Sequence, residues 1–517
     1  MKKNKILSLF LALMMICAVL PGCGDGSGSG TEGSNGLQAE RKANNEIVAA
    51  IAEDLKSLDP HSSTTAGTRE VLFNIYEGLF KTGPDGELIP AVAEKYTTSA
   101  DGLTYTFTLR DGVRFHNGNA VTAEDVIYSI KRCADNEGSA IDSSLVSAFS
   151  VISDVQATDD KTVVLTLKQP DLELLNFLTA AIVPANYDKL DTEPCGTGPF
   201  KFVSRTAQET VVLERFDDYW GGPAKTKLLT MKIVPEASQR TMMLETGEVD
   251  VAYEVPNNDI SRIQENKDLQ ILTSPSMKII LMELNCSSDG PVGNPDVRKA
   301  VECAINKQTI VDSLLYGFGT VSDNIIPQSA QDYREYDTNG YDPEKAKSLL
   351  AQAGYSDGIQ LTLWTNSNQT NTEIAQVLQS QLAEVGINLN IVTQDDNTSF
   401  SLIEAGEDFD LMLDFWQTNT GHADYVFNGM LLSTSVNNFS RYYNPEFDET
   451  YVKYASTGEG EEREALLKQL YDDMVTDTPI IGLYSETKVI AATSKLQGLM
   501  LSQIGAHEYQ NAVVTED

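Results

Sequence analysis

Histidine and cysteine are the side chains best suited to metal binding and nucleophilic catalysis, and their spacing in this chain suits neither. The histidines are scattered and form no HExxH pair; they are His61, His116, His422 and His507. No two of the six cysteines have the CxxC spacing of a zinc site. A GxSxG nucleophile elbow and a P-loop are also absent from the sequence. The chain therefore has the residues of a binding protein rather than an enzyme, and we expect no metal and no cofactor.

The first residues of the chain have the pattern of an export signal. Three lysines precede an apolar run over residues 6–20, which is too short to cross about 30 Å of hydrocarbon as a helix. The following Leu-Pro-Gly-Cys23 resembles the lipobox of bacterial lipoproteins, which implies cleavage before Cys23 and diacylglycerol on its sulfur. Residues 24–36 consist of small and polar residues that cannot bury apolar surface. We therefore expect a signal peptide over 1–22 and a lipidated, flexible tether over 23–45.

The Cys23 assignment predicts a change of location when the sulfur is removed. We expect Cys23→Ala protein to be released in soluble form or to persist as an unprocessed precursor, because alanine cannot carry the lipid. Cell fractionation followed by immunoblotting measures this. Membrane-bound, correctly processed Cys23→Ala protein would contradict the assignment.

The composition restricts the classes of partner that the remaining chain can bind. A formal net charge of −37 argues against binding to nucleic acid and against lying on anionic lipid. The chain is too long for one ordinary core, so we expect two or three domains. We also expect the protein to be a monomer. Because export permits disulfides, two states remain open for Cys133, Cys195, Cys286 and Cys303: four buried thiols, or a bridge between Cys286 and Cys303.

Hydrophobic periodicity predicts strands that alternate with helices from residue 46 onward, which is typical of mixed α/β lobes. Thr122, followed three residues later by Asp125, predicts a capped helix. Asp342 and Pro343 predict the start of another helix, which Gly354 should end. Further helices are expected at 238–245, 297–305 and 374–385, and strands at 47–51, 104–110, 162–167, 249–253, 279–284, 361–364, 387–391 and 409–415.

Distinctive short motifs are spread along this body. In order they are DGLTYTFTLRDGVRFHNG (101–118), TAEDV (122–126), GTGPF (196–200), GEVD (247–250), NPDVRKA (294–300) and YDPEKA (341–346). Together they resemble the solute-binding proteins of ABC importers for peptides and nickel chelates (family 5), over the chain from residue 46 to its end. This resemblance supplies the expected architecture.

The resemblance implies an α/β, two-lobed periplasmic-binding-protein-like fold (type II, with an extra subdomain) that closes on a ligand by a two-segment hinge. Lobe one would comprise residues 46–278, with the subdomain at about 82–186, and lobe two residues 279–484. Residues 485–517 would return to lobe one, so that two extended segments cross between the lobes. In such folds, ligands lie outside the carboxyl ends of the strands.

Two loops of lobe two follow expected strands at such ends, and each begins with a tryptophan. Phe409, Leu411, Leu413 and Phe415 alternate on one face of the second strand, so Trp416 should lie on its other face, toward the ligand. The candidate ligand residues are Trp364, Asn366, Asn368, Trp416, Gln417, Asn419, His422 and, in lobe one, Tyr76. The alternatives are that the tryptophans are core residues, that the amides are ordinary loop residues, and that His422 is a surface residue rather than a contact to a nickel chelate.

The resemblance also shows two departures in these loops. Peptide-binding relatives carry an aspartate for the ligand's amino group where this chain has Asn419. Dipeptide-type relatives carry an arginine in the first loop, and none lies between Trp364 and Asn371. Because a buried charge needs a counter-charge whereas amides satisfy neutral groups, these loops suit a longer peptide bound through its backbone, or a neutral oligosaccharide stacked on tryptophan.

We therefore expect the substrate-binding subunit of an ABC importer, which captures oligopeptides outside the membrane and delivers them to a permease driven by an ATPase subunit. It would be lipid-anchored at the outer face of the cytoplasmic membrane, extracellular or periplasmic. Binding of a nickel chelate or a neutral oligosaccharide, and a non-transport sensor of the same fold, remain open alternatives. A secreted enzyme would need a nucleophile–base pair that the sequence does not reveal.

Overall fold

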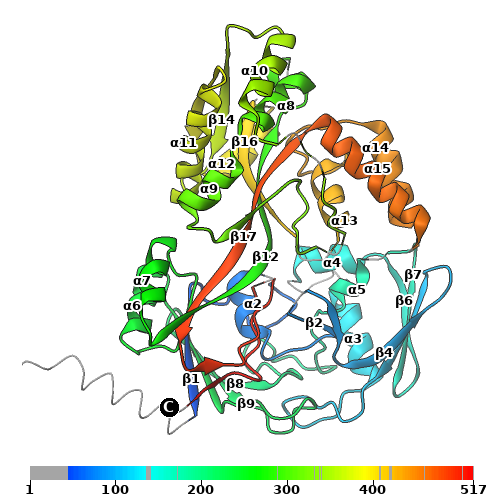
Figure 1. Cartoon of the computed structure of the whole chain (residues 1–517). Coiled ribbons are helices and arrows are strands. Elements are labelled where there is room, and N and C mark those ends of the chain that lie inside the picture. Colours follow the sequence, from blue (N-terminus) through cyan, green and yellow to red (C-terminus); the bar gives the residue numbers. More distant parts are fainter. Residues whose placement is uncertain are drawn as a thin grey trace, which may run out of the picture.

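The computed structural model describes residues 45–515 except 64, 85, 135–140, 172, 288, 331, 337, 339, 407–408, 419–421, 459 and 504. The expected signal peptide and Cys23 lie outside the described residues, as does Asn419. Within the described part, the chain folds into two lobes, drawn as the upper and lower halves of Figure 1. No helix in this part is both long and apolar enough to cross a membrane.

One large sheet runs through both lobes, and the described residues give it eleven strands. In the lower lobe it contains β11 (Val251–Tyr253), β1 (Glu46–Ile51), β10 (Leu228–Ile233), β9 (Thr210–Arg215) and β8 (Phe200–Thr206). In the upper lobe it contains β15 (Ile387–Thr393), β14 (Ile359–Thr365), β16 (Leu411–Gln417) and β13 (Gly319–Val321). Two long antiparallel strands, β12 (Leu269–Leu284) and β17 (Ile480–Thr493), pass from one lobe to the other (Figure 1).

A second, four-stranded sheet forms the core of a separate part of the lower lobe. It consists of β4 (Ala93–Thr98), β5 (Thr104–Leu109), β7 (Thr162–Leu167) and β6 (Ile152–Asp159). The short pairs β2 (Phe80–Thr82) with β3 (Leu88–Pro90), and β18 (Leu496–Gln497) with β19 (Val513–Val514), complete the strands. The helices of the lower lobe are α2 (Ala66–Leu72), α3 (Ala123–Ala134), α4 (Ser143–Phe149), α5 (Leu174–Phe177), α6 (Ala237–Glu245) and α7 (Ile260–Glu265). Those of the upper lobe are α8 (Pro295–Ala304), α9 (Lys307–Leu314), α10 (Pro343–Gln352), α11 (Gln369–Ala383), α12 (Asp396–Glu404), α13 (Asp424–Val426), α14 (Pro445–Ser456) and α15 (Glu461–Asp477).

Local capping explains why two expected helices form where the sequence placed them. The Asp125 carboxylate accepts from the Thr122 backbone N–H at 2.9 Å, and the Asp125 N–H donates to Thr122 Oγ1 at 3.4 Å. This is a reciprocal capping box for α3. Asp342 accepts from the Lys345 N–H at 2.9 Å ahead of α10, and Gly354 follows the helix with a φ of +92°.

The strand expected at 279–284 is longer than the sequence suggested, because β12 begins at Leu269. Its pairing with β17 is interrupted between Pro275 and Ile279, where the register shifts. Proline has no N–H to give the ladder, which explains the interruption inside a long strand. We propose that the hinge lies here, where the pairing of the two connecting strands is irregular.

The middle of β16 packs as the alternation predicts, but the expectation for Phe409 was wrong, because Phe409 precedes the strand and packs with Trp364 and Met412. Leu411 and Leu413 are buried against the helices of one face, and Trp416 packs on the opposite face. The expectation for Phe415 was wrong, because its side chain is 44% exposed. The Lys278 Nζ lies 4.6 Å from the centre of the Phe415 ring, so a cation rather than a helix covers it.

The four cysteines of the described part are free, which rules out the Cys286–Cys303 bridge in this structure. Cys133, Cys195 and Cys303 are buried and Cys286 is half-buried. Burial raises the pKa of the Cys286 and Cys303 thiols to about 11. Both thiols therefore stay protonated at neutral pH, as expected of packing residues.

Glu283 of β12 is a buried acid that should cost stability. Its side chain has no exposed surface, and both carboxylate oxygens lack a hydrogen-bond partner among the described residues. Burial and the charge of Asp414 raise its pKa well above the usual 4.5, and the nearby Ser440 N–H opposes this shift only in part. The native state therefore keeps a proton that the unfolded chain loses, so stability falls as the pH rises above about 4.5.

We expect Glu283→Met to raise the free energy of unfolding at pH 7 by about 1–3 kcal/mol, because it removes the unsatisfied carboxyl. The gain should shrink as the pH approaches 4.5. Urea unfolding at several pH values measures this, with the exposed Glu384→Gln as the control. A loss of stability at pH 7 would contradict this description of Glu283.

Candidate functional site

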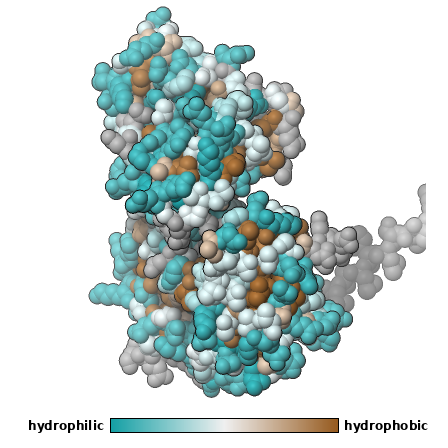
Figure 2. Space-filling view, turned by 90° about the vertical axis from the view of Figure 1, so that its right-hand side faces the viewer, coloured by the Kyte–Doolittle hydropathy of each residue, from teal (hydrophilic) through white to brown (hydrophobic). Residues whose placement is uncertain are grey.

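The two lobes face each other across a cleft. In Figure 1, α2, α4 and α5 of the lower lobe lie opposite α13 of the upper lobe, and Figure 2 shows the surface indented between the lobes. Two side chains link these elements electrostatically. Burial lowers the pKa of Arg69 on α2, while the charges of Glu70 and of Tyr425 on α13 oppose that shift. Arg69 and Tyr425 therefore lie within electrostatic range of each other.

Trp416 lies at the carboxyl end of β16, beside Ile279 of β12. Its indole contacts the Tyr425 ring, with centroids 5.7 Å apart. It also covers Gly429 in the π-helical segment Phe427–Leu431, where a Cβ would lie 2.3 Å from Trp416 Cζ2. The side chain is half-buried, and its Nε1 is buried without a hydrogen-bond partner among the described residues. Trp416 is thus packed along one side, and it stands next to a residue of the cleft.

His422 is held by a half-buried carboxylate. Its Nδ1 lies 3.0 Å from Asp332 Oδ2, which also accepts from the Ala423 N–H at 3.3 Å and from Tyr454 Oη at 3.2 Å. Burial alone would lower the pKa of His422, but the hydrogen bond with Asp332 and the charge of Glu173 raise it. Glu173 belongs to lobe one, so His422 has a partner in its own lobe and faces a negative charge across the cleft.

The first loop is placed differently from the second. Trp364 is 6% exposed and packs on Phe409, with ring centroids 5.4 Å apart. In the pairing of β14 with β16, Trp364 lies opposite Met412 rather than opposite Trp416. The Asn368 side chain caps α11 by accepting from the Thr370 and Asn371 N–H groups at 2.9 and 3.3 Å. These contacts favour packing and capping roles for the first loop.

The remaining candidates lie as follows. Asn366 accepts a hydrogen bond from the Asn371 side-chain amide at 3.0 Å. Gln417 is half-buried and pairs in register with Lys278, beside the proposed hinge. Trp416 and Gln417 thus end β16 and His422 precedes α13, whereas Trp364 lies near the end of β14, and Asn366 and Asn368 lie between that strand and the start of α11.

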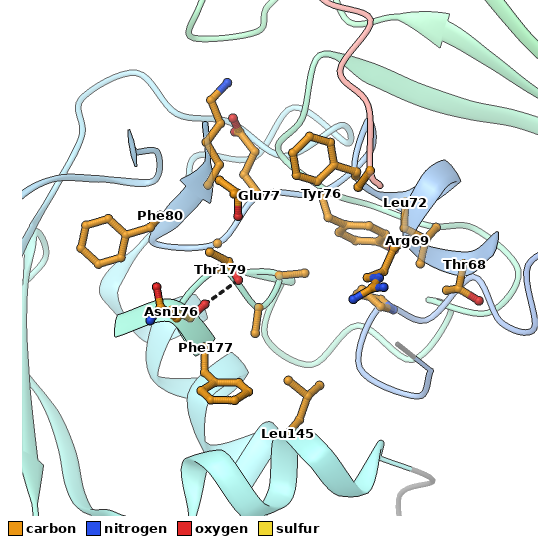
Figure 3. Close-up of a pocket in the computed structure, with 18 of the residues that line it drawn as sticks. Thr68, Arg69, Leu72, Tyr76, Glu77, Phe80, Leu145, Asn176, Phe177 and Thr179 are labelled. Carbon is orange, nitrogen blue, oxygen red and sulfur yellow. Dashed lines mark hydrogen bonds between the residues drawn. The ribbon is translucent and has the colours of Figure 1, made fainter. Parts of the chain in front are cut away.

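Tyr76 lines a pocket in lobe one that the sequence did not reveal. Figure 3 shows the pocket, to which α2 contributes Thr68, Arg69 and Leu72, α4 contributes Leu145, and α5 contributes Asn176 and Phe177. Its volume is about 200 Å³. The lining comes from segments far apart in the chain, and no motif joins them.

Two family-like motifs meet beneath Tyr76 and fix its position. A Cβ on Gly196 would lie 2.1 Å from the Ile75 carbonyl oxygen, so only glycine fits under the end of α2. His116 Nδ1 accepts from the Gly196 N–H at 3.3 Å, and its Nε2 therefore carries the proton and donates to the Gly198 carbonyl at 3.0 Å. The GTGPF and FHNG motifs thus have a packing role here.

Two carboxyl groups near the cleft have raised pKa values. Burial, and then the charge of Glu254, raise the pKa of Glu70 to about 8, and Lys488 opposes the shift. Burial and the charge of Asp171 raise the pKa of Asp424, which Tyr451 stabilises by a hydrogen bond. The half-buried Arg69 guanidinium and the half-buried Glu70 and Asp424 carboxyls could pair with a ligand that carries both a carboxylate and an amine.

Comparisons with known proteins agree with this architecture. Residues 87–438 match the model of the bacterial extracellular solute-binding proteins, family 5 middle. The chain is 31% identical over 489 residues to the glutathione-binding protein GsiB of Pectobacterium atrosepticum, which covers 91% of this chain and 94% of that protein. The GsiB protein of Escherichia coli K12 is 29% identical, with coverages of 90% and 94%.

Solved structures show the same fold. HbpA2 from Haemophilus parasuis has a TM-score of 0.82 at 25% identity and covers 91% of this chain and all of its own. DppA from Helicobacter pylori, solved with the peptide STSA, has a TM-score of 0.74 at 26% identity, with coverages of 91% and 98%. Proteins of this family are the binding subunits of ABC importers and work with a permease and an ATPase rather than as enzymes. The chain belongs to family 5 of the bacterial extracellular solute-binding proteins.

Proposed function

We propose that the ligand of this importer subunit is a short peptide, bound in the cleft between the lobes. The observation that carries the proposal is the pairing of two unlike walls. Trp416 and Tyr425 of lobe two form an aromatic wall, and α2 of lobe one carries the Arg69 guanidinium next to the Glu70 carboxyl, which is largely protonated at neutral pH and would ionise beside a bound ammonium group. An aromatic surface suits a peptide backbone or side chain, and the charges suit its termini.

The names of several relatives support a ligand of this class. The curated relatives are glutathione-binding proteins, and glutathione is itself a tripeptide. The DppA structure contains the peptide STSA, and a dipeptide-binding protein from Pseudoalteromonas, 25% identical with a TM-score of 0.75, contains Met-Leu. These ligands differ in length and linkage, so we propose only the class of short peptides for this chain.

The proposal extends to how the protein works at the membrane. We propose that Cys23 carries the lipid anchor and that the body is a monomer outside the cytoplasmic membrane. Closure would occur by bending of β12 and β17 near Pro275, and it requires a ligand that binds the closed state better than the open one. The closed form would then deliver the peptide to the permease.

Isothermal titration calorimetry with three forms of one tripeptide tests the proposed ligand. We expect the free peptide to bind, and we expect both the N-acetylated and the C-amidated forms to bind more weakly, because each lacks one charge that the cleft can pair. A neutral oligosaccharide and a nickel–histidine chelate serve as competing ligands. Tight binding of either, with no binding of any peptide, would refute the proposal.

A further inference from the structure

The lobe-one pocket is lined chiefly by apolar side chains from two separately packed parts of the lobe. Leu72, Phe73 and Tyr76 come from α2 and the turn after it. Phe80, Leu145 and Phe177 come from the part built on the four-stranded sheet. Leu72, Phe80 and Leu145 are 5%, 2% and 7% exposed, so their positions are fixed by packing. Figure 3 shows Leu72, Phe80, Leu145 and Phe177 around one hollow.

Several polar groups of the walls already have hydrogen-bond partners, and the Arg69 guanidinium lies at one side of the pocket. Thr179 Oγ1 donates to the Asn176 carbonyl oxygen at 2.7 Å, as drawn in Figure 3. The Ala181 carbonyl oxygen, in the wall behind, accepts from His61 Nε2 at 2.8 Å. Lys81 at the rim is paired with Glu508 at 2.9 Å. Since these polar groups already have partners, an apolar occupant would leave none of them newly unsatisfied.

The size of the pocket fits one large side chain. An engineered cavity of about 150 Å³ with a similar Leu, Ile and Phe lining binds benzene. The volume here, about 200 Å³, therefore accommodates a phenyl ring or a branched aliphatic chain, and it is too small for a second residue of the ligand. The pocket is lined partly by α4 and α5, which lie below α13 of the upper lobe in Figure 1, so a side chain seated in it would belong to a ligand held between the lobes.

We propose that this pocket is a specificity site for one large apolar side chain of the ligand, with phenylalanine or leucine preferred over alanine. The inference rests on the proposed peptide function and adds to it the class of side chain selected. Seating such a side chain also joins α2 to α4 and α5, so that ligand binding would fix the two parts of lobe one relative to each other.

The test is a tripeptide scan by calorimetry on the full mature protein. Alanine, leucine and phenylalanine are compared at each position of trialanine, which identifies the position that faces the pocket. At that position we expect phenylalanine to lower the Kd about 10- to 100-fold relative to alanine, the gain from burying a large apolar side chain. No gain at any position, with trialanine still bound, would overturn this inference and leave the proposed function standing. No binding of any tripeptide would overturn both.

Two variants of the pocket test whether the gain in affinity arises at this site. Ala180→Leu places a larger side chain in the wall and so fills part of the pocket. It should abolish the preference for phenylalanine while trialanine binds as before. Leu145→Ala enlarges the pocket and should shift the preference from phenylalanine to tryptophan, which keeps the test decisive if the first variant does not fold. Ala148→Leu, on the same helix as Leu145 but outside the pocket, is the control and should keep the wild-type preference. An unchanged preference in both pocket variants would overturn the inference.

Discussion

Replacing Trp416 by alanine is expected to weaken peptide binding by about 2 kcal/mol or more, which is roughly a 30-fold rise in Kd. The indole is half-buried at the carboxyl end of β16, and it stands beside Tyr425 of α13, the helix above α4 and α5 of the lower lobe in Figure 1. A flat aromatic side chain there offers a large contact area and loses little entropy on binding. Calorimetry with the free tripeptide measures the effect.

The same substitution should also lower the melting temperature, because the indole packs on Gly429 and Tyr425. Leu413→Ala separates the two effects. Leu413 is 4% exposed on the opposite face of β16, so its loss should cost about 2–5 kcal/mol of stability and leave the Kd unchanged. If Trp416→Ala lowers the melting temperature but not the affinity, Trp416 is a core residue and the ligand lies elsewhere.

Gly196→Ala is expected to destabilise the protein by about 3 kcal/mol, at the upper end of the cost of overpacking. Its Cβ would lie 2.1 Å from the Ile75 carbonyl oxygen and 2.8 Å from Tyr76 Cδ1. The first neighbour is backbone at the end of α2 and can move only if the helix moves. Because α2 carries Arg69 and the pocket wall, peptide affinity should fall as well.

Urea unfolding measures the loss, with Gly458→Ala as the matched control. A Cβ at Gly458 meets nothing within 4 Å, so that variant should retain wild-type stability and affinity. Equal stability of the Gly196→Ala and Gly458→Ala proteins would show that the end of α2 is free to shift, contrary to this description of the motif.

Elements with strong local signals were predictable from the sequence. The alternation in Thr104–Leu109 and the strand at Thr162–Leu167 are present, with every second residue buried. Asp342 and Pro343 start α10 as expected. These elements follow from capping groups and side-chain period, which the chain specifies within a few residues.

Features that depend on distant segments were not predictable. Pro275 looks like the end of a strand, yet pairing with β17 carries β12 through it. Phe415 fits the buried face of its strand, but Lys278 rather than a helix lies over its ring. The lobe-one pocket joins residues near 70, 145 and 177, which only the tertiary fold brings together.

In the candidate site, too, the features set by local sequence were predictable and those set by distant segments were not. The sequence placed Trp416 on the correct face of β16, because strand alternation is local. It also grouped Trp364 with Trp416, whereas the register of β14 aligns Trp364 with Met412 and buries it against Phe409. Arg69 and Glu70 lie in no recognisable motif, and only the approach of α2 to α13 identifies them as cleft residues.

The most direct test of a peptide-binding cleft is mass spectrometry of the molecules released by denaturing protein purified under native conditions. We expect wild-type protein to release short peptides enriched in one large apolar residue, and Trp416→Ala protein prepared in parallel to release far less. Release of an oligosaccharide or a nickel chelate without peptides from the wild-type protein would contradict this expectation.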